Sequence, residues 1–405
     1  MKKLLCILLS ALMMLSVFGM ALAEGDKEVT LNFWMWDDAQ QPAIQAMCDA
    51  YTKLHPNVKF NISCQPAVDS LNSKIQATVG TDAAPEIFFI NYNLAKEYIP
   101  MGFIQDLTEY KIDQSELAPG IVNAYTVDGK VYAVAKDTDS FAVFYNKELF
   151  DKAGVPYPKD DWTIDEFIET AKKLTKDDII GFTGSTSDRV WYNFIYANGA
   201  KLFDEKGEKC IVDTPEAEEV VQKLMDLQKD GGMFDAKKLS DIGDTGAFTS
   251  GKAAMTINGS WMISQYAEAL GDKLGVAELP SGKGGKFSTN HGIGYATTTS
   301  NKHMDETIDF LKFLATYDAQ VLQKKVVIPA NLKCAAEWEK EYPNLNLTPF
   351  KKALEYGVPY LTNKNATAAR TAFQDTLANL RAGQYKDAKE FLKAAQEAVN
   401  DAIEG

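Results

Sequence analysis

Three short apolar segments near the start of the chain alternate with two stretches of helical periodicity. Residues 29–34, 58–62 and 87–90 have the composition of β-strands, and the last of them is continuously apolar. Between them, apolar residues recur at helical spacing in 44–54 and again in 71–79. A continuous apolar run suits a parallel strand that is covered on both faces. The order β, α, β, α, β therefore predicts a doubly wound, mostly parallel α/β sheet flanked by helices.

Aromatic and polar residues follow two of these predicted strands. In doubly wound sheets the ligand lies beyond the carboxyl ends of the strands, which here are residues 34–38 and 91–93. Alternation along the first strand places Trp34 and Trp36 on one side and Met35 on the other. We therefore expect both strand ends to face one crevice, with both tryptophans as candidate ligand contacts. Core packing is the alternative, and it suits Trp34 better.

Two aspartates come directly after the tryptophans. Asp37 is predicted to contact the ligand, whereas Asp38 is expected to start the helix that begins near Gln40. Asn91, followed by Tyr92, ends the third strand at the same crevice and is a candidate contact for a ligand hydroxyl. A plain turn is the alternative for this pair.

The first 23 residues have the pattern of a secretory signal. Lys2 and Lys3 precede an apolar stretch that runs to about residue 22 and ends in a small-x-small site, which predicts cleavage after Ala23. We therefore expect an exported protein, in a periplasm or at the cell surface. Cys6 lies too early in this segment to attach a lipid, so the sequence indicates no anchor.

Charge and cysteine content narrow the function further. The formal net charge is −14, and acidic residues are spread along the chain, which disfavours nucleic acid and anionic membranes as partners. Four cysteines remain after the signal, too few for a disulfide framework. Cys48 and Cys64 could form one bridge, or all four could be free thiols.

The rest of the chain continues the α/β pattern. Strand-like residues 130–134 and 141–145 flank a short polar segment, and helical and strand-like stretches alternate beyond it, which predicts a second α/β lobe. Residues 362–403 are alanine-rich with apolar stripes and are predicted to be helical. No long linker appears, so the two lobes must be joined by strands.

Four strings, in this order, resemble those of one family. Residues 84–88 (APEIF) resemble its P-D-V-F strand, and residues 137–150 (DTDSFAVFYNKELF) its D-T-x-x-L-x-Y-N-K-x-L-F crossover. Residues 153–163 resemble A-G-V-x-x-P-x-x-W-T, and residues 248–261 (FTSGKAAMTINGSW) resemble F-x-x-G-K-A-A-M…G-x-W. From about residue 28 to residue 403 the chain thus resembles the extracellular solute-binding proteins of carbohydrate ABC importers, the group that includes maltose-binding protein.

The resemblance implies a two-lobed periplasmic-binding-protein fold of the class II type. Such a protein closes on a mono- or oligosaccharide and delivers it to membrane permease subunits, without a cofactor; we expect a monomer. The resemblance also implies three crossings between the lobes, near residues 137–138, 288–290 and 329–331. The first lobe is then expected to comprise residues 24–138 and 290–329, and the second residues 139–289 and 330–405.

Candidate contacts are also predicted outside the first strands. A saccharide needs flat aromatic surfaces and directed polar groups. Asp139 lies in the first crossing, Trp191 and Asn193 begin a predicted helix, and Trp261 follows a strand end at Gly259, where a glycine would let the ligand approach the backbone. Gly292 and Tyr360 complete the set. For each of them a packing, turn or hinge role is the alternative.

Support for a chemical reaction is weak. The histidines at positions 55, 291 and 303 lack metal-ligand spacing, and no P-loop or G-x-S-x-G motif occurs, so we expect no metal, cofactor or catalytic residue. Two alternatives stay open. One is a glycoside hydrolase, which also sets two acids beside aromatic platforms. The other is a carrier of a polyamine or metal chelate, caged by Asp37, Asp38, Asp137 and Asp139.

Overall fold

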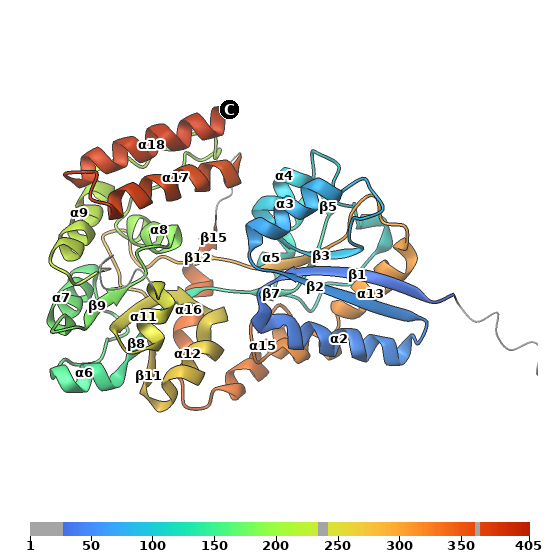
Figure 1. The fold of residues 1–405 in the computed structure, drawn as a ribbon, viewed down its shortest axis with the longest axis horizontal. Helices are drawn as coiled ribbons and strands as arrows, with labels where there is room; N and C mark the ends of the chain where they lie inside the picture. The colour runs from blue at the N-terminus through green and yellow to red at the C-terminus, as the bar shows by residue number, and fades with distance from the viewer. Residues whose placement is uncertain (1–26, 234–241, 361–364) are drawn as a thin grey trace, which may run out of the picture.

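The computed structural model describes residues 27–233, 242–360 and 365–405, which form two lobes side by side (Figure 1). The predicted signal segment with its cleavage site after Ala23, and the first residues of the predicted C-terminal helical stretch, lie outside the described residues. Each lobe is built around its own sheet, and short strands run between the two.

The first lobe contains a five-stranded sheet in the order β2-β1-β3-β13-β6. Strand β1 pairs in parallel with both β2 and β3, whereas β13 is antiparallel to β3 and to β6. The strands are β1 (Val29–Trp36), β2 (Val58–Gln65), β3 (Ile87–Asn91), β6 (Val134–Ala135) and β13 (Ile293–Ala296). The predicted β, α, β, α, β opening is therefore confirmed.

Helices cover both faces of this sheet, with α3 and α4 above it and α2 and α13 below it in the view of Figure 1. Helix α2 buries Ile44, Met47 and Tyr51, which recur at helical spacing, and proline stands at its start, where no backbone donor is lost. Between the layers Phe33 lies edge-on to Phe89, with ring centroids 5.8 Å apart. These helices are α2 (Gln41–Leu54), α3 (Val68–Thr78), α4 (Tyr92–Tyr98) and α13 (Met304–Leu314).

The second lobe contains a four-stranded sheet in the order β11-β8-β10-β9. Its strands are β8 (Phe141–Asn146), β9 (Ile180–Thr183), β10 (Ala253–Gly259) and β11 (Leu274–Ala277). Two of its three pairings are antiparallel, which differs from the mostly parallel sheet that we expected. The reason is that β8 enters directly from the crossing and runs away from the first lobe, whereas its neighbours run toward it.

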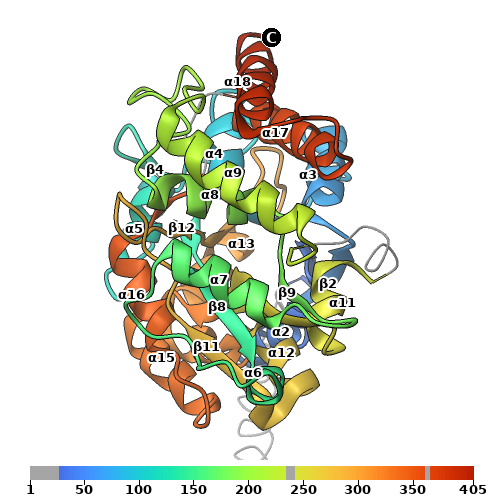
Figure 2. The same ribbon diagram turned by 90° about the vertical axis from the view of Figure 1, so that its left-hand side faces the viewer.

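Helices pack on both faces of the second sheet, and Figure 2 shows α7 in front of it, with α9 above α7. Helix α7 begins with a complete capping box between Thr163 and Glu166, which satisfies two backbone donors at its N-terminus. The helices around this sheet and beside it are α6 (Lys147–Ala153), α7 (Ile164–Leu174), α8 (Asp188–Ala197), α9 (Pro215–Lys229), α11 (Gly243–Thr249), α12 (Ile263–Leu270), α15 (Leu332–Trp338), α16 (Thr348–Tyr356), α17 (Ala366–Arg381) and α18 (Ala388–Glu404).

The chain passes between the two sheets three times, as predicted. Strand β7 (Asp137–Thr138) pairs with β14 (Ile328–Pro329), and β12 (Thr289–Asn290) pairs with β15 (Val358–Pro359). These paired segments lie between the lobes in Figure 1. The residue boundaries given above for the two lobes stay a prediction.

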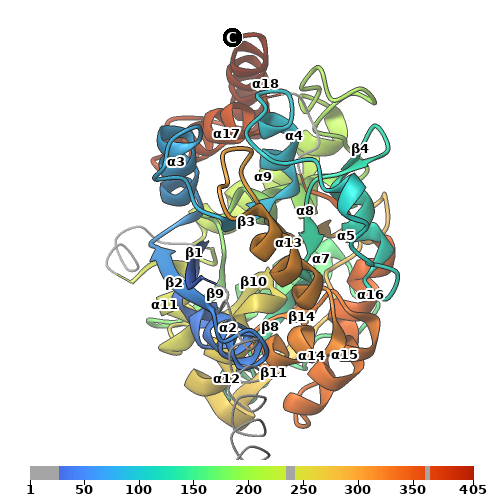
Figure 3. The ribbon, with the colours of Figure 1, turned by 90° about the vertical axis from the view of Figure 1, so that its right-hand side faces the viewer.

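Helix α17 adds a contact between the lobes away from these crossings. In the view onto the first lobe, it lies across the top of the molecule near α3 and α4 (Figure 3). The Glu97 carboxylate of the first lobe accepts hydrogen bonds from the Thr367 backbone N–H (2.9 Å) and hydroxyl (3.1 Å). The lobes are therefore held together on that side by the C-terminal helices.

All four described cysteines are free thiols. Cys48, Cys210 and Cys334 are buried, and Cys64 is partly buried. Of the two possibilities left open for Cys48 and Cys64, the structure has the free form. Burial raises the pKa of each thiol, which disfavours the reactive thiolate.

Candidate functional site

A pocket of about 370 Å³ lies between the lobes. The ends of β1 and β3 form its wall on the first lobe. The segment after β10 and the start of α8 form its wall on the second lobe, and two of the crossings form its base. Five of the predicted site residues line it: Trp36, Asp37, Asn91, Asp139 and Trp261. The two strand ends therefore do face one crevice, as the sequence predicted.

A second, more apolar pocket of about 530 Å³ lies on the other side of the crossing strands. Side chains alternate along an extended strand, so Thr138 and Asn290 line this apolar pocket, whereas Asp139 and His291 line the first one. The apolar pocket is bordered by α15 and α16, and no residue of β1 or β3 lines it, whereas Trp36 and Asn91 line the first pocket. The first pocket is thus the better candidate for the functional site.

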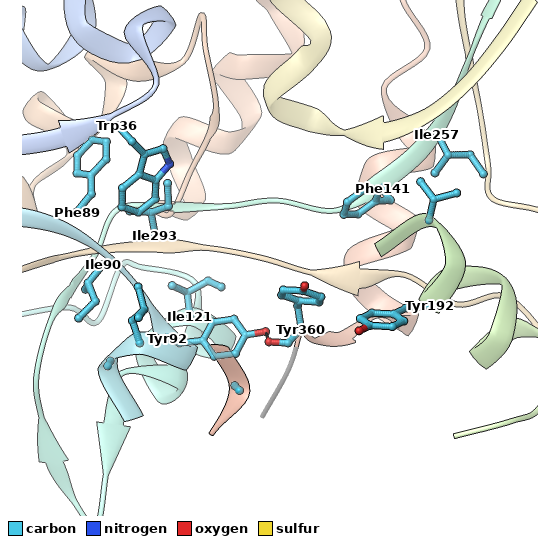
Figure 4. Packing of buried hydrophobic residues seen from close by; sticks show 14 of the residues in the cluster. Trp36, Phe89, Ile90, Tyr92, Ile121, Phe141, Tyr192, Ile257, Ile293 and Tyr360 are labelled. Atoms are coloured by element: carbon cyan, nitrogen blue, oxygen red, sulfur yellow. Dashed lines mark hydrogen bonds between the residues drawn. The ribbon is translucent and has the colours of Figure 1, made fainter. Parts of the chain in front are cut away.

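Trp36 and Trp34 have different surroundings. Trp36 lies at the end of β1, edge-on to Phe89 with ring centroids 5.4 Å apart, and borders the pocket (Figure 4). Trp34 lies two residues earlier on the same strand and is buried. The Lys74 ammonium lies 3.8 Å from its ring centroid. Trp34 does not line the pocket, so its ligand contact stays a prediction.

Of the two aspartates after β1, Asp37 both lines the pocket and caps the following helix. Asp37, with φ at 72°, caps the short 3₁₀-helix Asp38–Gln40: its carboxylate accepts from the Ala39 N–H (3.2 Å) and from the Gln40 amide (2.8 Å). Asp38 is exposed and does not line the pocket. Asp38 is the first residue of this 3₁₀-helix, as expected, but the carboxylate that caps the helix comes from Asp37. A carboxylate that accepts from a backbone N–H in the first turn of a helix belongs to the N-cap residue, which here is Asp37.

Trp261 forms the aromatic wall on the second lobe. Its half-buried ring lies edge-on to Phe141, with centroids 5.4 Å apart and an interplanar angle of 88°. A Cβ atom on Gly259 would lie 1.9 Å from an atom of this ring. The glycine is thus needed for the close approach of the Trp261 ring itself, rather than of a ligand, to the strand end.

The Gly259→Ala substitution is expected to displace the Trp261 ring from the pocket wall. Affinity for the ligand should then fall by about 1–3 kcal/mol if this ring is a central contact. Calorimetric titration would measure the change, with Gly120→Ala as the control, because a Cβ at Gly120 meets nothing within 4 Å. Equal affinities of the two variants would contradict this assignment of Gly259.

Asp139 is buried at the base of the pocket. Its backbone exchanges two hydrogen bonds with His291, both 2.8 Å long, and its carboxylate accepts a hydrogen bond from the Ser260 hydroxyl. Burial, aided by the negative charge of Asp137, raises the pKa of Asp139 to about 8. At neutral pH most of this carboxyl group is therefore protonated and can donate as well as accept.

This pKa shift predicts a pH dependence of stability. Between the ordinary pKa of 3.8 and about 8, folded Asp139 keeps a proton that the unfolded chain releases. Raising the pH across this range should therefore lower the free energy of unfolding, by at most about 1.4 kcal/mol per pH unit. Urea denaturation of the wild type and of Asp139→Asn would measure it: the wild type should lose stability relative to the variant as pH rises. A pH-independent difference would contradict the shift.

Arg189 and His291 also line the pocket, and the sequence reasoning did not select Arg189. The Arg189 guanidinium carbon lies 5.6 Å from the Trp261 ring centroid and 5.0 Å from that of Tyr360. Burial, together with the charges of Arg189 and Arg370, lowers the pKa of His291 well below its ordinary value, so this imidazole is neutral at pH 7. One feature of the sequence that could have pointed to Arg189 is the rarity of arginine in this chain.

The other predicted contacts have packing roles, and none of them lines this pocket. Trp191 is fully buried and donates its indole N–H to the Ser185 carbonyl (3.0 Å), and Asn193 accepts from the Thr289 N–H (2.8 Å). A Cβ on Gly292 would lie 2.7 Å from the Asp137 carbonyl oxygen, so this glycine lets two crossings pass closely. Ligand contacts by these three residues stay predictions.

Tyr360 lies between the lobes at the edge of the pocket. Its backbone carbonyl accepts from the Tyr92 hydroxyl of the first lobe (Figure 4). Its own hydroxyl donates to Asp188 of the second lobe. The ring is buried and borders a smaller pocket that shares Asn91, Arg189 and His291 with the larger one. Tyr360 therefore links the lobes, and its ligand contact stays a prediction.

The described residues also bear on metal binding and on membrane insertion. Within residues 27–233, 242–360 and 365–405, no group of three or more histidine, cysteine, aspartate or glutamate side chains is placed to hold a metal ion. Over the same part of the chain, every helix is too short or too polar to span a bilayer.

Comparison with known proteins gives consistent matches. Residues 37–321 match the family model of the bacterial extracellular solute-binding proteins. The lactose-binding protein of Rhizobium radiobacter is 26% identical over 314 residues, which cover 73% of this chain and 72% of that protein.

Two solved structures share the fold. An ABC substrate-binding protein from Listeria monocytogenes in complex with cycloalternan has a TM-score of 0.86 at 22% identity, over 94% of this chain and 100% of that one. The GacH receptor of Streptomyces glaucescens, solved unliganded and in complex with acarbose, has a TM-score of 0.81 at 25% identity, over 93% and 98% of the two chains. The two-lobed α/β fold predicted from the sequence is confirmed by these structures.

Proposed function

The chain belongs to the bacterial extracellular solute-binding proteins, and we propose that it captures a mono- or oligosaccharide between its lobes and delivers it to the permease of an ABC importer. Membership in this family makes it a binding protein rather than an enzyme, as the sequence predicted. The proposal also includes an exported monomer, cleaved after Ala23. Its lobes would comprise residues 24–138 with 290–329, and residues 139–289 with 330–405.

The observation that carries the proposal is the pair of tryptophans on opposite walls of one pocket. Trp36 comes from the first lobe and Trp261 from the second, and polar groups of Asp37, Asn91 and Gln265 lie around them. Sugar rings present C–H faces that pack on aromatic rings and hydroxyls that pair with carboxylates and amides. A ligand that contacts both walls stabilises the closed form, because only that form offers both at once.

The ligands of similar proteins support a saccharide over the other solutes considered. One relative is named for lactose, and the two structural neighbours were solved with cycloalternan and acarbose. The four-carboxylate cage that a polyamine would need is not supported, because Asp38 lies outside the pocket and Asp137 is paired with Lys136 (2.5 Å). A saccharide therefore remains the proposed ligand.

Thermal-shift screening of the purified exported protein tests the proposal. The panel should contain neutral and acidic mono- and oligosaccharides, polyamines and metal chelates, and each sugar should be analysed by chromatography after incubation. We expect a saccharide to raise the melting temperature and to be recovered intact. Release of shorter sugars would support the hydrolase alternative, and stabilisation by a polyamine or chelate alone would overturn the saccharide proposal.

A further inference from the structure

Arginine is rare in this chain and is confined to two helices. Of the 42 lysine and arginine residues only three are arginines, at positions 189, 370 and 381, in α8 and α17. Lysine thus supplies nearly all positive charge at the surface. Arginine differs from lysine in its planar fork of donors, which fits carboxylate and phosphate groups with two parallel hydrogen bonds. Two of the three arginines, Arg189 and Arg370, face the cleft between the lobes.

Arg370 already has partners. Its Nε lies 3.6 Å from the Asp188 carboxylate, and a terminal nitrogen lies 4.0 Å from Asp69 of the first lobe. The Asp188 carboxylate also accepts from Gln374 (3.1 Å) and from the Tyr360 hydroxyl. Asp188 is therefore fully engaged, and Arg370 helps to hold α17 against the cleft.

Arg189, in contrast, has no counter-ion. It makes no hydrogen bond or ion pair with any residue that the structure describes, and its Nε is buried without an acceptor. Its head group is held between the rings of Trp261 and Tyr360 at the junction of the two cleft pockets. A partly buried cation without an anionic partner is costly, and an anion that reached it would be bound strongly.

The nearby groups do not remove this excess of positive charge. Asp37 and Asp139 line the same pocket, but within the described ranges neither carboxylate forms an ion pair with Arg189, and each accepts hydrogen bonds from neutral groups instead. The Nε2 atom of His291, at the same junction, is buried and also lacks a partner. Among the described residues, the Nε atoms of Arg189 and Arg370 and the Nε2 atom of His291 thus lack a hydrogen-bond partner beside one small pocket, and of the two arginines only Arg189 also lacks an ion pair.

We infer that the saccharide taken by this cleft carries an anionic group, a carboxylate or a phosphate, which the Arg189 guanidinium binds with His291 Nε2 beside it. The inference rests on the proposed function and makes it more specific. The sugar ring would pack against Trp261, and Asp37 and Asn91 would pair with its hydroxyls. A neutral sugar would leave Arg189 without a counter-ion in the closed form.

Matched ligand sets test this inference. Glucose would be compared with glucuronate and glucose 6-phosphate, galactose with galacturonate and galactose 6-phosphate, and a partial hydrolysate of starch with one of polygalacturonate. Titration calorimetry should show at least one acidic member binding about tenfold or more tightly than its neutral parent, given the strength of charge-assisted bidentate pairs. Comparison of the uronates with the sugar phosphates shows whether the anionic group is a carboxylate or a phosphate.

Variants then assign the preference to Arg189. Arg189→Gln should lower affinity for the acidic member about tenfold or more and leave affinity for its neutral parent nearly unchanged, whereas Arg189→Lys should retain part of the preference. Arg381→Gln is the control, because it removes the same charge from a residue whose terminal nitrogen donates to the Ser185 carbonyl (3.3 Å), outside the pocket. It should leave both affinities as they are.

The outcomes separate this inference from the function on which it rests. Equal or tighter binding of the neutral parents, or an acidic preference that survives Arg189→Gln, would overturn the anionic ligand and leave the saccharide proposal standing. Binding of no neutral or acidic sugar would overturn both.

Discussion

Replacing Trp261 by alanine is expected to weaken saccharide binding by about 1–3 kcal/mol, the usual cost of truncating a central aromatic contact. The ring forms the second-lobe wall of the pocket, and Gly259 leaves room for it to lie there. Its half-buried position means that its loss removes contact area from the ligand more than from the protein core. Calorimetric titration with the saccharide found by screening would measure the loss.

The matched control for Trp261 is Trp338, which is buried in the core of the second lobe and borders only the apolar pocket behind the crossings. Trp338→Ala should lower the free energy of unfolding by about 3–5 kcal/mol and leave the affinity of the folded protein nearly unchanged. If Trp261→Ala behaved in the same way, with a lower melting temperature and unchanged affinity, Trp261 would be a core residue.

Replacing Lys136 by methionine is expected to lower the free energy of unfolding by about 3–5 kcal/mol, because it breaks a buried ion pair from one side. The Lys136 ammonium lies 2.5 Å from the Asp137 carboxylate and donates to the Gln40 amide oxygen at 2.5 Å, and both charged side chains are fully buried. Without Lys136, the donor left to the Asp137 side chain among the described residues would be the Ile293 N–H (2.7 Å). Urea denaturation would measure the loss.

Two further variants define the Lys136 experiment. The double variant Lys136→Met with Asp137→Asn should recover part of the lost stability, because no charge is then left buried and unpaired. Lys130→Met removes a solvent-exposed partner of Asp106 (3.2 Å) and should change stability little. If Lys136→Met lowered the free energy of unfolding as little as Lys130→Met, this result would contradict the role assigned to the buried pair.

Much of the fold could be predicted because its signals are local. The three strands at the start of the first lobe and the two helices between them follow from apolar periodicity over short windows. A proline marks the start of α2, because a helix tolerates proline in its first turn and not in its interior. The direction of β8 could not be predicted in this way. It depends on where the chain enters the second lobe, which no local pattern records.

The site was predictable where single strand ends define it. Trp36 and Asp37 end one strand, and Trp261 follows a strand that ends in glycine, so local spacing was enough to select them. Choosing between Asp37 and Asp38 as the cap required the backbone φ of Asp37. The meeting of Arg189 with His291 joins residues about a hundred positions apart, and only the folded chain brings them together.

The central claim is that the two lobes together bind one saccharide without changing it. Calorimetric titration of the purified protein with its stabilising saccharide, followed by chromatography of the recovered sugar, tests this claim most directly. We expect saturable binding of one saccharide per chain, loss of affinity in Trp36→Ala as well as in Trp261→Ala, and full recovery of intact sugar. Binding that neither tryptophan affects, or a shortened sugar in the recovered sample, would contradict it.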